Sequence, residues 1–231
     1  MAFTAKKILK YTGTEPHEYI PMIRGADQSF WGVNVPITIM LKYEPKPENR
    51  LSDCPSGGPW WHTPEDRIDK LDEKIMMRDA AINLEVIEEL EAADPLPIKI
   101  PEFMEEYTNH LQKILSQLGS SFNAEPIKES WNELRKAMDV VAEKQSAGKL
   151  QDIDIKETVG RLLHVIYCHD SETTHDYGDS FGIFKALDKF NGLEEKNCSR
   201  AYFTIAKTDF LRTRNRLIHG FSEVIDYISH L

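Results

Sequence analysis

The segment Arg-Asn-Arg-Leu-Ile-His-Gly, residues 214–220, holds three side chains that could act together on a phosphodiester. Histidine titrates near neutral pH, so His219 could remove the proton of a ribose 2′-OH or protonate the leaving oxygen. The guanidinium of Arg214 could neutralise the charge that develops on the phosphoryl oxygens. Asn215 lies four residues before His219, where on a helix its amide could hold one imidazole nitrogen. This chemistry requires no metal ion.

A helix is expected from about residue 199 to the end of the chain, and Gly220 could interrupt it. Its apolar stripe would consist of Phe203, Phe210, Leu211, Leu217, Ile218, Phe221, Val224, Ile225 and Ile228. Arg214 falls in the middle of that stripe, and burying an unpaired guanidinium is costly. We therefore expect Arg214 to be paired or to face a wet cleft. An Arg-Asn-Arg run near a helix C-terminus can also simply complement the negative end of the helix dipole.

The string R-N-R-L-I-H-G-F, residues 214–221, resembles the signature of HEPN domains. That signature has an arginine, a polar residue that is often asparagine, three further residues and a histidine. The segment SFGIFKALDKF, residues 180–190, is similar to the helix that precedes the motif helix in several HEPN groups. The resemblance covers the region from about residue 100 onward and does not extend to the first 60 residues. It implies an all-α bundle that forms a homodimer, with two motifs facing one cleft.

The resemblance also implies an activity. It suggests a metal-independent endoribonuclease, a toxin or defence effector that cleaves RNA by 2′-OH attack at the dimer interface. Arg214, Asn215 and His219 would be the catalytic set, and His169 and Asp170 would be accessory residues at the edge of the cleft. No cofactor or metal is expected, and an antitoxin or regulatory protein would be a partner. The alternative is a non-catalytic HEPN-like interaction or regulatory protein, in which Arg214 pairs with a carboxylate.

Two further arginines flank Arg214 in the motif. Arg212 and Arg216, with Lys207 one to two turns earlier, could contact several RNA phosphates. They could equally pair with the acidic helices in the middle of the chain. The net charge of −10 argues against binding nucleic acid as a general coat, because that needs many cations to displace counterions. One small basic site remains compatible with this charge.

A second group of polar residues surrounds a loop before the motif. It consists of His164, His169, Asp170, His175 and Asp176. Imidazoles and carboxylates so close together could bind a divalent metal and serve a phosphohydrolase. The alternative is an ordinary solvated loop, and the histidine and aspartate positions that such hydrolases also need cannot be assigned.

Composition indicates the class of protein. The 231 residues contain no apolar run of the ~20 residues that a membrane span needs, and no secretory signal is recognisable. The three cysteines form no CxxC pair, so neither a disulfide framework nor a zinc ribbon is indicated. We therefore predict a cytoplasmic protein without membrane association.

The pattern of elements predicts a mainly α fold, an HEPN-like helical bundle with a small irregular or β-containing extension. The extension covers residues 1–62 and includes a strand at about 33–41, where apolar residues alternate. The helical domain covers residues 63–231, with the motif-bearing core at about 100–231. Its helices are expected at 63–93, 102–118, 125–145, 153–168, 180–190 and 199–231, the first capped by Thr63 and the second ended by Gly119.

Overall fold

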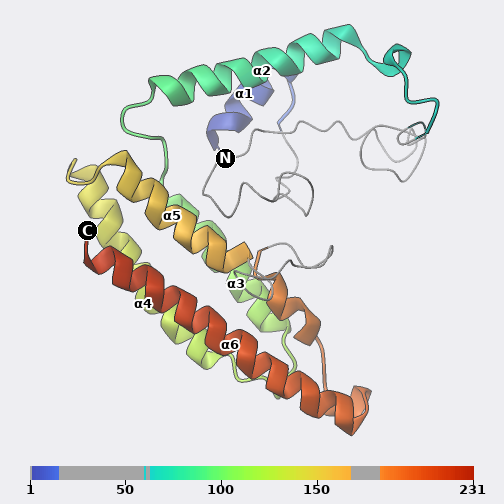
Figure 1. Ribbon diagram of the computed structural model, residues 1–231, viewed down its shortest axis with the longest axis vertical. Helices are drawn as coiled ribbons and strands as arrows, with labels where there is room; N and C mark the ends of the chain where they lie inside the picture. Colours follow the sequence, from blue (N-terminus) through green and yellow to red (C-terminus); the bar gives the residue numbers. More distant parts are fainter. Residues whose placement is uncertain (1, 16–59, 61–62, 168–182) are drawn as a thin grey trace. The chain divides into compact units, whose positions relative to one another are not determined.

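The computed structural model describes residues 2–15, 60, 63–167 and 183–231 (Figure 1). These residues form two compact units, of which the first contains 2–15, 60 and 63–94 and the second contains 95–167 and 183–231. Apart from an isolated antiparallel bridge between Leu118 and Asn191, the regular structure in these ranges is helical, which confirms the mainly α fold. The strand expected at 33–41 lies outside the described residues.

The first unit contains helix α1 (Ala2–Thr12) and helix α2 (Glu73–Ala92). Residues 63–94, which we assigned to the helical domain, belong to this unit, and α1 was not predicted. The segment 2–12 contains neither glycine nor proline, and alanine, lysine and leucine favour a helix. Gly13 follows with a φ of +68°, a value that suits the end of a helix. The composition of residues 2–12, taken by itself, was therefore enough to indicate α1.

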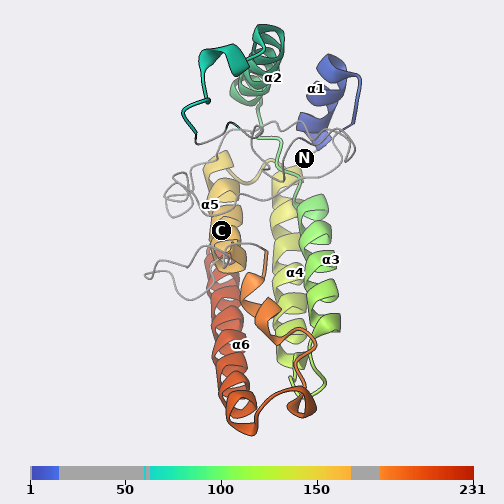
Figure 2. The ribbon, with the colours of Figure 1, turned by 90° about the vertical axis from the view of Figure 1, so that its right-hand side faces the viewer.

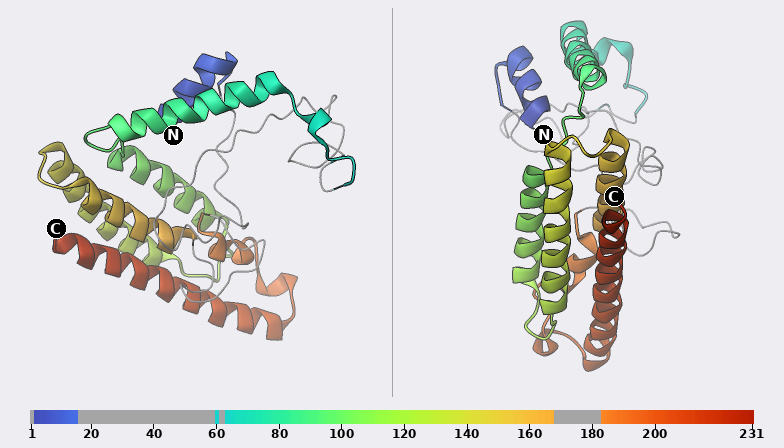
Figure 3. Two further views of the ribbon diagram at one scale, coloured as in Figure 1. Left: turned by 45° about the horizontal axis from the view of Figure 1, so that its top comes forward. Right: turned by 90° about the vertical axis from the view of Figure 1, so that its left-hand side faces the viewer.

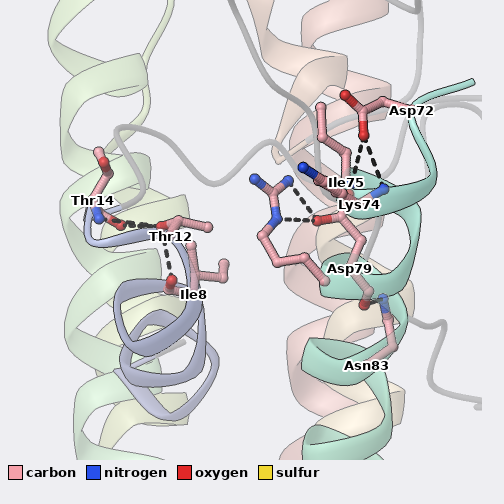
Figure 4. Close-up of polar contacts among 9 residues, drawn as sticks. Ile8, Thr12, Thr14, Asp72, Lys74, Ile75, Asp79 and Asn83 are labelled. Atoms are coloured by element: carbon pink, nitrogen blue, oxygen red, sulfur yellow. Dashed lines mark hydrogen bonds and ion pairs between the residues drawn. The ribbon is translucent and has the colours of Figure 1, made fainter.

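Helix α2 begins ten residues later than Thr63, the N-cap that we predicted. A short 3₁₀ helix, η3 (Ile68–Lys70), precedes it, and Asp72 is the N-cap. The Asp72 carboxylate accepts from the backbone N–H groups of Lys74 at 2.9 Å and Ile75 at 3.1 Å (Figure 4). Thr63 instead closes a turn, where its hydroxyl donates to the carbonyl of Trp60 at 2.6 Å. Asp72 offers a charged acceptor to the positive end of the helix, which stabilises this start.

One carboxylate of α2 contacts three side chains of α1. Glu85, whose side chain is 22% exposed, pairs with Lys7 at 3.4 Å and accepts hydrogen bonds from Lys10 and from the Tyr11 hydroxyl. Lys7 also pairs with Glu89. The hydrogen bonds from Lys10 and Tyr11 lower the pKa of Glu85 from its ordinary value of 4.5 to about 2.

Acid should therefore weaken this contact. Because the folded-state pKa of Glu85 is depressed, its stabilisation is complete above 4.5 and is lost as the pH falls through about 2. We expect the Glu85→Gln variant to melt at a lower temperature than the wild-type protein at about pH 5. This difference in melting temperature should shrink towards pH 2. Thermal unfolding followed by circular dichroism measures it. Glu88→Gln, at an exposed position of the same helix, is the control, and an equal effect of both substitutions would contradict the prediction.

The second unit is a bundle of helices α3 (Ile100–Gln117), α4 (Glu125–Ser146), α5 (Asp152–Tyr167) and α6 (Arg200–Ser229), seen along its side in Figures 2 and 3. These bounds agree with the predicted helices to within two residues. The helix expected at 180–190 is shorter, because only a 3₁₀ helix, η5 (Lys185–Phe190), forms in its described part. A second 3₁₀ helix, η6 (Glu195–Asn197), leads to α6. No described helix is long and apolar enough to span a bilayer.

Aromatic contacts fix α6 against the rest of the bundle. Phe122 lies 5.1 Å from Phe210 and 5.9 Å from Phe203, between ring centroids. On α4, Trp131 packs against the fully buried Phe221 at 5.2 Å, and its indole N–H donates to Thr108 of α3 at 3.0 Å. Because aromatic rings bury large areas, these contacts hold α6 in a defined rotation about its axis.

Two glycines allow backbones to approach closely. At Gly119 an added Cβ would lie 1.8 Å from the carbonyl oxygen of Leu193. We predicted that Gly119 ends its helix; its φ is not positive, so the close approach to Leu193 explains the glycine rather than a left-handed turn. At Gly220 an added Cβ would lie 2.7 Å from both γ-methyl groups of Val165 on α5. Helix α6 continues through Gly220, so no break occurs there (Figure 1).

Candidate functional site

The buried face of α6 differs from the apolar stripe that we predicted. It consists of Phe203, Ala206, Phe210, Thr213, Leu217, Gly220, Phe221, Val224 and Ile228. The small residue Gly220 lets α6 lie close to Val165 of α5. The buried face of α6 is therefore rotated towards α5. Leu211 is consequently 46% exposed, and Arg214 lies half-buried at the edge of the face rather than in its middle. The arginine therefore does not interrupt the core.

Arg214 makes its hydrogen bonds with its neighbour in the sequence. Its Nε and Nη2 atoms donate to the side-chain oxygen of Asn215 at 3.3 and 3.2 Å. Within the described ranges, no carboxylate lies within ion-pair distance of the Arg214 guanidinium. Asn215 thus orients the arginine, whereas we had predicted that it would orient the histidine.

His219 lies on the outer side of α6, where its side chain is 74% exposed. Its Nε2 atom is 3.5 Å from a carboxylate oxygen of Glu223, one turn further along the helix. Among the residues that the structure describes, no hydrogen bond joins His219 to Asn215. Five residues on an α-helix correspond to about 140° of rotation, so the side chains of Arg214 and His219 leave the helix in different directions.

An open hollow of about 500 Å³ adjoins His219, and we call it the α6 hollow. It is lined by Arg161, His219, Ser222, Glu223, Asp226, Tyr227 and His230. The guanidinium of Arg161, on α5, lies over the Tyr227 ring at 4.4 Å from its centroid. The hollow therefore brings a cation, imidazoles and carboxylates to one wet surface, which suits proton transfer to and from a polar ligand.

Sequence reasoning missed most of these lining residues. The pairing of His219 with Glu223 could have been found, because residues four apart face each other on a helix. Arg161 had no such signal, since only the packing of α5 against α6 brings it to Tyr227.

The remaining predicted site residues are more scattered. Arg212 is exposed and Arg216 is half-buried on α6, while His169 and Asp170 lie outside the described residues. The alternative metal cluster at 164–176 has only His164 inside them, on α5. Within the described part of the chain, no group of three histidines, cysteines or carboxylates is arranged to hold a metal ion.

The chain was also compared with known proteins. Neither the protein-family models, nor the curated proteins, nor the solved structures contain a match to it.

Proposed function

We propose that the protein is a metal-independent endoribonuclease of the HEPN type, active as a homodimer with Arg214, Asn215 and His219 at the interface. The observation that supports this proposal most is the exposure of His219, together with the lack of a carboxylate beside Arg214 among the described residues. His219 stands 74% exposed at the wall of an open hollow, and Arg214 has no carboxylate partner within the described residues. A non-catalytic protein that used these side chains for structure would be expected to seal or neutralise them.

The geometry of one helix supports the proposed dimer. Arg214 and His219 are about 140° apart around α6 and about 7.5 Å apart along it, so one chain does not direct both groups at one phosphate. A two-fold axis would place the histidine of one chain opposite the arginine of its partner, as in an isologous interface. The exposed Leu211, on the same half of α6, would gain burial there.

In the proposed reaction His219 takes the proton of the ribose 2′-OH, and the resulting oxygen attacks the adjacent phosphorus. The bond from phosphorus to the 5′-oxygen breaks, the leaving oxygen takes a proton from solvent, and the imidazolium later returns its proton to solvent, so that the product carries a 2′,3′-cyclic phosphate. Arg214, oriented by Asn215, stabilises the charge on the phosphoryl oxygens. Glu223, 3.5 Å from the Nε2 atom of His219, can hold the imidazole in position.

The biological setting is part of the same proposal. An enzyme of this kind would act on RNA in the cytoplasm as a toxin or defence effector. An antitoxin or regulatory protein would then be needed to restrain it, and the acidic chain offers a surface for such a partner.

Incubation of the purified protein with a labelled RNA tests the proposal. We expect cleavage that persists in excess EDTA and yields 2′,3′-cyclic phosphate ends, identified by mass spectrometry. Oligomeric state should be measured on the same sample by light scattering. Intact RNA after incubation with a verified dimer would contradict the nuclease and favour the non-catalytic interaction protein.

A further inference from the structure

Three cations recur at intervals of seven residues along α6, namely Arg200, Lys207 and Arg214, and we call them the cation row. Seven residues amount to nearly two turns, so each cation is displaced by only about 20° around the axis from the one before. The three side chains therefore lie on one side of the helix. Leu211, which is 46% exposed, lies next to the row between its second and third members.

The cation row is available to a ligand. Arg200 and Lys207 are exposed and Arg214 is half-buried. Lys207 lies over the Phe203 ring at 5.8 Å, a contact that does not neutralise its charge. None of the three forms an ion pair with a carboxylate in the described ranges of the chain. Within the described residues, three positive charges along one side of one helix thus have no carboxylate partner.

The surrounding sequence is basic although the chain is acidic. Residues 200–216 contain five cations and one carboxylate, Asp209, which gives a net charge of +4 against −10 for the whole chain. Asp209 pairs with Lys189 of η5 at 2.6 Å and is thereby partly neutralised. The positive charge of α6 is therefore local, which favours a polyanion bound at this helix over one that coats the protein.

We propose that a single strand of RNA binds along the cation row, with backbone phosphates at Arg200 and Lys207, and reaches the reactive centre at Arg214. This inference rests on the proposed function and assigns the direction in which the substrate lies on the helix. A straight row of cations on one helix matches the backbone of one strand, whereas a duplex is contacted across its grooves.

The length of the row sets the size of the bound segment. Fourteen residues of α-helix span about 21 Å, which corresponds to about six nucleotides at the 3.4 Å rise of a stacked strand. Affinity should therefore rise with oligonucleotide length up to about six nucleotides and change little beyond that length.

The test measures RNA binding without cleavage, in the full chain carrying His219→Ala. The probe is fluorescein-labelled U12 RNA, and its anisotropy gives the dissociation constant at several NaCl concentrations. We expect R200A/K207A to reduce the salt slope of log K by about 1.4, since each phosphate contact on a single strand contributes about 0.7. The matched control, R135A/K136A, removes one arginine and one lysine from exposed positions of α4 and should leave the slope unchanged.

Three results would overturn the cation row. The first is that U12 RNA does not bind, and the second is that both double variants lose the same amount of salt slope. The third is that poly-glutamate binds as tightly as U12, which would assign the helix to an acidic peptide. The two proposals fail separately. If the wild-type protein cleaves RNA but R200A/K207A leaves the salt slope unchanged, only the cation row is rejected. A reduced slope without any cleavage rejects only the nuclease and leaves an RNA-binding surface.

Discussion

Replacing His219 by alanine is expected to slow RNA cleavage by about 10²- to 10⁴-fold, the usual contribution of a general acid or base. The loss should appear in the rate of the chemical step under single-turnover conditions. Because the His219 side chain is 74% exposed, its removal should leave thermal stability unchanged. His230→Ala, at another histidine position on the wall of the α6 hollow, is the comparison and should retain most of the activity. Equal losses in both variants would contradict the assigned role.

A mixing experiment tests whether two chains share the site. His219→Ala and Arg214→Ala should each be inactive alone, but a mixed dimer would contain one site with an intact arginine and an intact histidine. After subunit exchange, about a quarter of the wild-type activity should return, because half of the dimers are mixed and each has one of its two symmetric sites intact. Native mass spectrometry confirms the exchange. Mixed dimers without activity would show that each site draws both groups from one chain.

The substitution Gly119→Ala is expected to have the largest effect on stability. Its Cβ would lie 1.8 Å from the Leu193 carbonyl oxygen, a backbone atom that cannot rotate away. The segment around Leu193 would have to move. Two backbone hydrogen bonds oppose this movement, because Gly192 donates to the carbonyl of Gln117 at 2.8 Å and Gly119 donates to that of Phe190 at 3.3 Å. We expect a loss of about 3 kcal/mol in the free energy of unfolding.

Gly192→Ala is the matched control for this prediction. Gly192 has a φ of +61°, and an added Cβ there would meet open space. Only backbone strain opposes that substitution, so about 1 kcal/mol should be lost. Urea denaturation followed by circular dichroism gives both values. Similar losses at the two positions would mean that the contact with Leu193 relaxes at little cost.

Helices α4 and α5 could be predicted closely because their apolar residues follow the helical period and glycine or polar residues bound them. The start of α2 could not, since both Thr63 and Asp72 are good caps and only the local chain direction decides between them. Helix α1 was missed because the prediction rested on the glycine- and proline-rich residues that follow it. The division into two units depends on which helices pack together, which periodicity does not reveal.

In the candidate site, too, the sequence did not reveal how the helices pack. Composition and spacing predicted Arg214 and His219 as candidate reactive residues, and both lie on one helix. They did not reveal that Thr213 would take the buried position beside Arg214, because the rotation of α6 depends on its aromatic contacts and on its close contact with α5 at Gly220. The partner of each polar group likewise depended on side-chain rotation, and Asn215 contacts the arginine rather than the histidine.

The continuity of α6 through Gly220 has a mechanical consequence. The helix has 30 residues, and a rod of that length extends about 45 Å. Arg214 and His219 both lie just before the close contact between Gly220 and Val165, and the helix is unbroken between them. Neither residue can swing independently through the backbone. An inhibitor or activator that acts on this pair would have to twist or slide the entire rod, or change the angle at which two such rods cross.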